Sequence, residues 1–249
     1  MTTELQLKPE TTEYPPLSPA TCSASFRGVS IINADCMAVM SKLADKSYDL
    51  AICDPPYGIG AAGKKQYHAG ALTEYTPKKW DAAIPPAEYF DELQRVSKNQ
   101  IIFGATYFTA HLPPAKNWIV WDKLQPEGVS FSMHELAYYS GGGQAKICRA
   151  YNGGNRVANN DEKAQKYIRI HPTQKPVTLY AWLLANYAQP GFRILDTHLG
   201  SGSSAIAALE HGYEMLATEI DEHYFEAAVK RIGLHEQQQS FAMTPNVES

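Results

Sequence analysis

Apolar residues along this chain gather in short runs that alternate with amphipathic stretches and with polar segments rich in glycine and proline. Seven runs are rich in β-branched, aromatic or other apolar residues and are expected to form strands. They cover residues 29–33, 48–53, 100–103, 118–121, 135–139, 193–196 and 214–218. Apolar side chains recur at helical spacing near Met37 and Met40 and in residues 86–96, 176–187, 203–211 and 222–232. Strands interleaved with helices predict an α/β fold.

Four segments lack such periodicity. Residues 1–25 and 235–249 are predominantly polar and are expected to be flexible tails on a single domain that covers residues 26–234. Residues 58–80 and 141–170 are expected to be long loops within that domain, and loops of this length are commonly functional.

The distribution of charge suggests a function for these two loops. The chain has a net charge of −4, yet residues 58–80 and 141–175 are both basic, so that the remainder is strongly acidic. Local potential matters more than net charge for binding a polyanion, and the pattern is typical of a phosphate-binding face. An equally good explanation at this level is that the lysines only solvate two loops.

Composition also excludes several classes of protein. The four cysteines and eight histidines show no CxxC, HxxxH or HExxH spacing, so neither a disulfide framework nor a metal site is expected. No apolar run is long enough to cross a membrane, and residues 1–20 contain no signal-peptide core. A cytoplasmic protein is the expectation.

The first candidate site is the turn Asp54-Pro55-Pro56-Tyr57, which follows the strand expected at 48–53. Ligands of open α/β sheets bind at the carboxyl ends of strands. Two prolines stop the strand and offer only carbonyl acceptors, beside a carboxylate and an aromatic ring. This combination suits a planar ring that carries an NH2 group, such as a nucleobase. An ordinary proline-rich turn is the alternative.

The second candidate is the glycine-rich loop at Gly200 and Gly202, between an expected strand and an expected helix. Glu219 follows the next strand, about 20 residues on, where a carboxylate can accept both hydroxyls of a ribose. This spacing predicts an adenosine site. The similar sequence from Gly58 to Gly63 precedes no helical pattern, and Lys65 replaces the Ser or Thr of a phosphate-binding loop. A mobile loop is therefore expected there.

With these motifs in order, residues 29–232 resemble the beta class of DNA amino-methyltransferases, which use S-adenosylmethionine. The resemblance rests on Asp54 to Tyr57, on His171-Pro172-Thr173-Gln174-Lys175-Pro176, and on residues 196–203, with 119–123 and 134–135 similar to the sheet core of the family. It implies a Rossmann-like fold with a seven-stranded, mostly parallel sheet. The motif order is circularly permuted, because Asp-Pro-Pro-Tyr precedes the glycine loop.

The resemblance also implies roles for individual residues. Gly200, Gly202 and Ser203 would approach the methionine end of the cofactor, Glu219 its ribose, and Asp35 and Cys36 its adenine. The other implied cofactor-binding positions are Asp54, Thr173, Lys175, Asp196, Leu199, Ser201 and Ile220. Thr197 and Leu199 replace a proline and a phenylalanine that are common in the family, and His198 lies in the same loop.

The chemistry expected at Asp54 is acceptance of a hydrogen bond, with the Pro55 carbonyl as second acceptor and Tyr57 stacked on a flipped-out base. Pro56 completes this catalytic turn. An Asp-led motif favours adenine N6, with cytosine N4 as the alternative. Methylation of RNA or of a protein amide, an inactive DNA-binding module, and a nicotinamide-dependent oxidoreductase are further alternatives.

The expected partner is double-stranded DNA, contacted by Lys64, Lys65, Arg156 and Lys166 in the two basic loops. Dimers occur in the family, so a homodimer is a further expectation, as is a companion restriction endonuclease. No membrane partner is expected.

Overall fold

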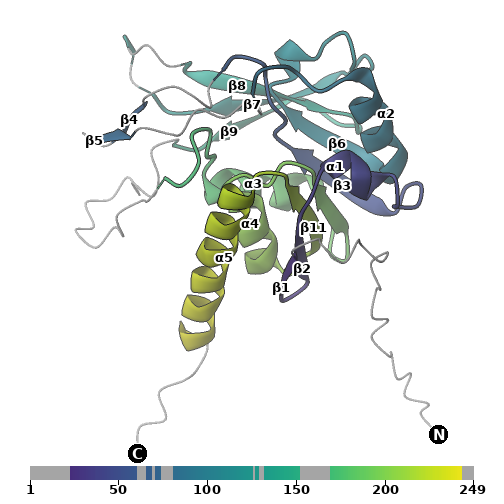
Figure 1. Ribbon diagram of the computed structural model, residues 1–249. Coiled ribbons are helices and arrows are strands. Elements are labelled where there is room, and N and C mark those ends of the chain that lie inside the picture. The colour runs from purple at the N-terminus through teal and green to yellow at the C-terminus, as the bar shows by residue number, and fades with distance from the viewer. Residues whose placement is uncertain are drawn as a thin grey trace, which may run out of the picture.

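A computed structural model describes residues 23–60, 66–68, 71–73, 81–125, 127–128, 132–151 and 169–242 (Figure 1). Its main sheet contains nine strands in the order β1-β2-β11-β10-β3-β6-β8-β7-β9. These are β1 (Ser23–Phe26), β2 (Val29–Asn33), β3 (Tyr48–Cys53), β6 (Ser97–Phe103), β7 (Asn117–Asp122), β8 (His134–Tyr139), β9 (Lys146–Arg149), β10 (Arg193–Asp196) and β11 (Glu214–Glu219). A separate antiparallel pair consists of β4 (Gln66–His68) and β5 (Ala71–Thr73).

Five neighbouring strands, β2, β11, β10, β3 and β6, pair in parallel. β1 is antiparallel to β2 at one side of the sheet, and β8 is antiparallel to both β6 and β7 at the other. The sheet is therefore mixed, and it has nine strands where the sequence predicted seven. All seven predicted strands are present, and β1 and β9 are the additions to the main sheet.

Helices cover both faces of the sheet, which gives three layers (Figure 1). They are α1 (Cys36–Met40), α2 (Ala87–Val96), η2 (Ala105–Tyr107, a 3₁₀ turn), α3 (Val177–Tyr187), α4 (Ser203–His211) and α5 (Glu222–Ala242). Helices α3, α4 and α5 pack on one face, and α1 and α2 pack on the other. No helix in the described part of the chain is long and apolar enough to cross a membrane.

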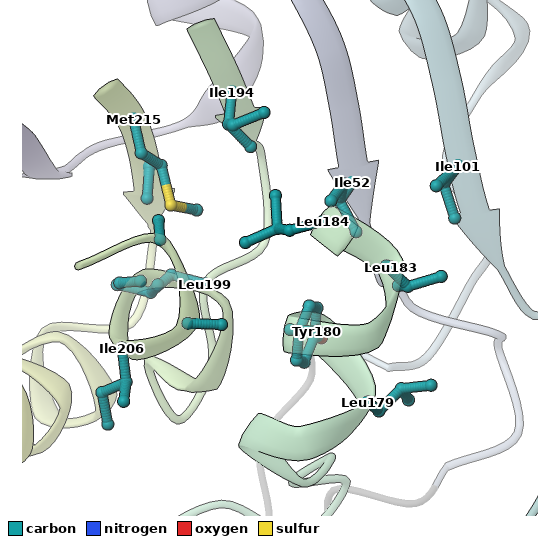
Figure 2. Close-up of a cluster of buried hydrophobic side chains, with 14 of the residues drawn as sticks. Ile52, Ile101, Leu179, Tyr180, Leu183, Leu184, Ile194, Leu199, Ile206 and Met215 are labelled. Carbon is teal, nitrogen blue, oxygen red and sulfur yellow. The ribbon is translucent and has the colours of Figure 1, made fainter. Parts of the chain in front are cut away.

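The period-two alternation of a strand explains why both faces can be covered. Leu50 and Ile52 of β3 lie in the core beneath α3 and α4, whereas Ala51 and Cys53 lie in the core beneath α1 and α2. Figure 2 shows the first of these cores, where side chains of α3 and α4 meet side chains of the central strands. A sheet buried on both faces fixes the carboxyl ends of its strands rigidly.

The folded region extends into both of the segments that were predicted to be tails. Residues 23–26, of which 23–25 were placed in the tail by the sequence pattern, form β1 and pair with β2 across a turn at Gly28, whose φ is +74°. Helix α5 does not end at Ile232 but continues to Ala242. Its Glu and Gln residues beyond His235 favour helix without forming an apolar stripe, so periodicity missed them. Residues 1–22 and 243–249 lie outside the described structure.

Candidate active site

The site begins with four neighbouring parallel strands that end at the same edge of the sheet. β2, β11, β10 and β3 carry acidic residues at or just beyond their carboxyl ends, namely Asp35, Glu219, Asp196 and Asp54. The glycine-rich loop follows β10 and the Asp-Pro-Pro-Tyr turn follows β3, so the two motifs follow adjacent strands. The parallel pairing thus brings together the two candidate sites that the sequence indicated separately.

The turn at Asp54 to Tyr57 is held by a buried carboxylate outside the motif. Asp81, which is 2% exposed, accepts hydrogen bonds from the backbone N–H groups of Tyr57 (3.0 Å) and Gly58 (2.9 Å) with the same oxygen, Oδ1. Pro55 is buried and Pro56 is partly buried. Since the prolines cannot donate backbone hydrogen bonds, Asp81 supplies the acceptor that fixes the end of the turn.

Around Asp54, four side chains form a closed ring of polar contacts. Lys175 Nζ lies 2.6 Å from Asp54 Oδ2 and 2.9 Å from Glu135 Oε1. The Tyr57 hydroxyl lies 2.5 Å from Asp54 Oδ1 and 2.6 Å from Glu135 Oε1, and Lys175 Nζ lies 3.2 Å from the hydroxyl oxygen. Lys123 Nζ approaches the other oxygen of Glu135 at 3.1 Å. Two carboxylates and two ammonium groups therefore balance each other's charge.

The two carboxylates of this ring have different pKa values because their surroundings differ. Burial alone would raise the pKa of Glu135, but Lys175 and Lys123 outweigh it and lower the pKa to about 2. Burial raises the pKa of Asp54, and although Lys175 opposes this, the negative charge of Glu135 adds to it. The pKa of Lys175 is raised, since the two carboxylates outweigh the effect of its burial. Glu135 is thus the firmly ionised member, and Asp54 the better proton acceptor.

The ring of Tyr57 is fixed by packing as well as by its hydroxyl. It stacks on Tyr107 with a centroid distance of 5.2 Å and an interplanar angle of 14°, and its edge contacts Phe108. A Cβ atom built on Gly104 would lie only 2.1 Å from the Tyr57 ring, so the ring occupies space that only glycine leaves free. Of the stacked pair, Tyr107 is 48% exposed.

On the cofactor side, Gly200 and Glu219 are joined directly. The Gly200 N–H donates to Glu219 Oε2 (2.8 Å), and the Asp221 N–H donates to Oε1 (2.9 Å). Glu219 is 8% exposed, and burial raises its pKa although the backbone N–H groups of Asp221, Gly200 and Ile220 oppose the rise. The carboxylate is thus fixed beside the glycine loop, and a carboxylate at this position is the acceptor that recognition of a ribose diol requires.

Other predicted residues of the glycine loop hold the loop itself. Asp196 Oδ2 accepts a hydrogen bond from the Ser204 hydroxyl (2.5 Å), and Asp196 Oδ1 accepts one from the His198 N–H (2.9 Å). Burial raises the pKa of Asp196 to about 7. A Cβ on Gly202 would lie 2.9 Å from Ile232, so this glycine permits close packing of α5. Asp196 and Gly202 therefore support the loop, and their role as cofactor contacts stays a prediction.

Arg231 of α5 completes this support. Its guanidinium donates to the Ser201 carbonyl oxygen (2.7 Å) and to the Ser203 hydroxyl (2.9 Å), and the two serine hydroxyls lie 3.1 Å apart. Leu199 is buried, and its N–H donates to the Thr218 carbonyl oxygen. The hydroxyls predicted to face the cofactor are thus already engaged within the protein.

The predicted adenine side lies at the ends of β2 and β11. Asp35 is exposed and caps α1 by accepting from the Met37 N–H (2.8 Å), and Cys36 is partly buried. Burial, with help from Asp35, raises the pKa of the Cys36 thiol to about 12. Ile220, 61% exposed, directly follows Glu219. An exposed aliphatic side chain beside a buried carboxylate offers a surface for a purine ring.

The segment from His171 to Pro176 connects the two halves of the site. The His171 ring packs against Gly200 and against Tyr224, and it accepts from the Thr173 N–H (3.3 Å). Burial, assisted by Lys175, lowers the pKa of His171 to about 3, so the ring is neutral. Four residues further on, Lys175 reaches the ring of contacts around Asp54. This one segment therefore sets the spacing of the glycine loop from the proline turn.

The departures from the family pattern have their own contacts. The Thr197 hydroxyl lies 2.7 Å from the Tyr89 hydroxyl and 2.9 Å from His198 Nδ1, and the Tyr89 and His198 rings meet edge to face. Burial lowers the pKa of His198 to about 4. A hydrogen-bonded network thus takes the place of the family's proline and phenylalanine, and His198 has a packing role.

The predicted DNA contacts Lys64, Lys65, Arg156 and Lys166 lie outside the described residues, as do most residues of the two long loops. Residues 146–149 of the second loop are not loop at all but form the edge strand β9.

Sequence reasoning missed three of the side chains around Asp54. Glu135 and Lys123 were noted only as part of the sheet core, and Asp81 was given no role. Glu135 lies in β8 and Lys123 directly follows β7, and only the pairing β3-β6-β8-β7 brings them to the site. The apolar pattern around a charged residue within a strand is the one signal that could have found Glu135.

Comparison with known proteins agrees with this geometry. Residues 116–230 match the N6 and N4 methyltransferase family model, described as DNA methylase. The putative methylase YubD of Escherichia coli (strain K12) is 27% identical over 217 residues, which cover 81% of this chain and 88% of that protein. These matches make the chain similar to DNA amino-methyltransferases, with the family model covering residues 116–230.

Two solved structures share the fold. The M1.HpyAVI–SAM complex is 20% identical, with a TM-score of 0.52 and coverage of 82% of this chain and 99% of that chain. The PvuII DNA methyltransferase (cytosine-N4-specific) is 12% identical, with a TM-score of 0.54 and coverage of 84% of this chain and 92% of that chain.

Proposed function

We propose that this protein transfers the methyl group of S-adenosylmethionine to the exocyclic amine of a base in DNA. The observation that carries the proposal is the placement of Asp54 and of the Gly200–Glu219 pair at the ends of neighbouring parallel strands. A methyl donor bound at one and an amine held at the other would meet at the same edge of the sheet. The match of residues 116–230 to the DNA methylase family model and the fold shared with M1.HpyAVI, solved as a complex with SAM, support the proposal.

The residues present fit this cofactor. Glu219 offers a carboxylate acceptor for the ribose hydroxyls, and the Gly200 backbone has no side chain that would block an approaching ligand. Asp35 can accept from the adenine amine, and the exposed Ile220 can cover one face of the ring. Thr173 and Lys175 border the same region through the segment that packs on Gly200. The bound cofactor would supply an electrophilic methyl group on a sulfonium.

Asp54 is suited to accept the N–H groups of the target amine. An ionised carboxylate has about four lone-pair positions. Tyr57 uses one on Oδ1 and Lys175 one on Oδ2, so one on each oxygen is left. With the Pro55 carbonyl as a further acceptor, Asp54 would aim the lone pair of the amine at the methyl group. When the new N–C bond has formed, the nitrogen must lose one proton, and the carboxylate with the raised pKa is the nearest suitable base.

For the target base we propose adenine N6, on the resemblance of the Asp-led motif. Cytosine N4 is the second candidate, and the fold shared with the cytosine-N4-specific PvuII enzyme favours it. Both reactions use the same acceptors for an aromatic NH2 group. The choice between them depends on the pocket for the ring, to which Tyr57 and the exposed Tyr107 are the nearest aromatic candidates.

We propose double-stranded DNA as the partner, held through Lys64, Lys65, Arg156 and Lys166. Their support is the basic charge of the two loops, which would attract phosphates. A homodimer, a companion restriction endonuclease and a cytoplasmic location are proposals that rest on the resemblance and on composition.

The test is incubation with unmethylated genomic DNA and S-adenosylmethionine, followed by reading of modified bases along the DNA. We expect N6-methyladenine within one short recurring sequence. N4-methylcytosine would replace the adenine proposal by its alternative, and absence of any methylated base would refute the function. Alanine variants of the four basic residues should weaken DNA binding and flatten its salt dependence; unchanged affinity and slope would refute their role.

A further inference from the structure

Glu135 is a partly buried carboxylate, with 15% of its side chain exposed, to which the proposed methyl transfer gives no direct part. It comes from β8, two strands away from the β3 end that carries Asp54. Even so, it contacts the same two partners as Asp54, with the Tyr57 hydroxyl at 2.6 Å and Lys175 Nζ at 2.9 Å. Lys123 lies at 3.1 Å from its second oxygen. A carboxylate that shares both partners of a proposed catalytic carboxylate can control its state.

The hydrogens of the ring can be counted. Lys175 as an ammonium ion has three N–H donors, and the structure gives it three acceptors: Asp54, Glu135 and the Tyr57 hydroxyl oxygen. The single hydrogen of Tyr57 then goes to one of the two carboxylates. The ring is complete only while Lys175 is protonated and both carboxylates are ionised. Loss of the lysine proton would leave two like charges facing each other without a cation between them.

We propose that Glu135 is a positioning residue for methyl transfer, which holds Lys175 as an ammonium ion against Asp54 so that the Asp54 carboxylate keeps its cationic partner and stays correctly turned toward the amine. The link to methyl transfer rests on the function proposed above. The link between Glu135 and Lys175 rests on the described contacts alone. A purely structural Glu135 would contribute to stability but would not set the pH range in which the enzyme works.

The decisive variant is Glu135→Gln, which keeps the size and an acceptor oxygen but removes the charge. Glu127→Gln is the matched control, because Glu127 is an exposed glutamate in the connection between the same two strands, β7 and β8. Three quantities are measured from neutral to alkaline pH: the titration midpoint of Lys175 by NMR of ¹³C-labelled lysine, kcat at saturating cofactor and DNA, and the KM for the cofactor. Thermal melting confirms that each variant is folded.

In Glu135→Gln, we expect the Lys175 midpoint and the alkaline limb of kcat to move down together by about 1–3 pH units, as for loss of one opposite charge at contact distance. The KM for the cofactor should stay unchanged, and the control should match wild type in all three. Lys123→Met is a second variant, and it should act in the opposite sense. Because it removes the second lysine beside Glu135, the full negative charge of Glu135 then acts on Lys175, and the titration midpoint of Lys175 should rise.

The outcomes separate the inference from the function. An unmoved Lys175 midpoint in both variants overturns the inference, whatever the activity. A midpoint that moves while the alkaline limb of kcat stays in place overturns the positioning role of Glu135 in methyl transfer. If wild type methylates no DNA but the Lys175 midpoint still moves, the proposed function fails, and the control of Lys175 by Glu135 stands.

Discussion

Gly104 offers a sharp test of how tightly the site is built. Its φ is +65°, and a Cβ there would lie 2.1 Å from the Tyr57 ring. To reach the 3.4 Å of ordinary contact, the ring must move by about 1.3 Å. The Tyr57 hydroxyl bonds Asp54 at 2.5 Å and Glu135 at 2.6 Å, and such a shift stretches both bonds beyond useful length. Hydrogen bonds to charged groups contribute about 1.5–3 kcal/mol each.

Gly60 provides the matched control, because it has the same φ of +65° and nothing within 4 Å of a built Cβ. Gly60→Ala should lower the free energy of unfolding by only the left-handed backbone strain, about 1–2 kcal/mol. Gly104→Ala should cost about 3 kcal/mol more than that, with a loss in kcat of about 100-fold because Tyr57 is displaced. Urea unfolding and single-turnover methyl transfer measure the two effects. Equal unfolding energies for the two variants would refute the reasoning about the Tyr57 ring.

Three further predictions follow from single contacts. Asp81→Ala removes the acceptor of two backbone N–H groups and should lower the free energy of unfolding by about 2–4 kcal/mol. Asp91→Ala, at an exposed position of α2, is the control and should lower it by less than about 0.5 kcal/mol. Equal free energies of unfolding for the two variants in urea would contradict the role of Asp81. The pKa of Asp196 is raised from 3.8 to about 7, so folding favours its protonated form. As the pH rises from about 4 to about 7, the contribution of Asp196 to stability should therefore fall by about 1.4 kcal/mol per pH unit. Asp196→Asn should lose this slope. A slope that persists in the variant would disprove that Asp196 is its source. Tyr107→Ala removes the exposed partner of the Tyr57 stack and should raise the KM for DNA about 10-fold with cofactor affinity unchanged. A DNA titration that gives the wild-type KM would argue against base contact at this ring.

The sequence predicted the centre of the sheet well and its edges poorly. The central strands β3 and β6 are buried on both faces, so their apolar runs are nearly continuous. The edge strands β1 and β9 have exposed or partly exposed residues at most positions and therefore carry almost no hydrophobic signal. The same reasoning explains why the count of seven strands was too low.

The sequence predicted those residues of the candidate site that belong to recognisable motifs at the ends of strands. Asp54 and Glu219 were found because strand ends, prolines and glycines are visible in sequence. Glu135 and Asp81 act through contacts with residues distant in the chain, which only the folded structure reveals, and strand pairing is what brings Glu135 to the site. Ser203, which was predicted to face the cofactor, is bonded to Arg231 within the protein, and its role toward the cofactor stays a prediction.

The central claim is that Asp54 accepts the target amine while the glycine loop holds the methyl donor. Its most direct test is transfer of labelled methyl from S-adenosylmethionine to DNA by wild type and by Asp54→Ala, with cofactor affinity measured for both by calorimetry. The account predicts transfer to a base amine by wild type, loss of at least about 1,000-fold in rate in the variant, and equal affinity for the cofactor. An undiminished rate in Asp54→Ala, or no transfer to DNA by wild type, would contradict it.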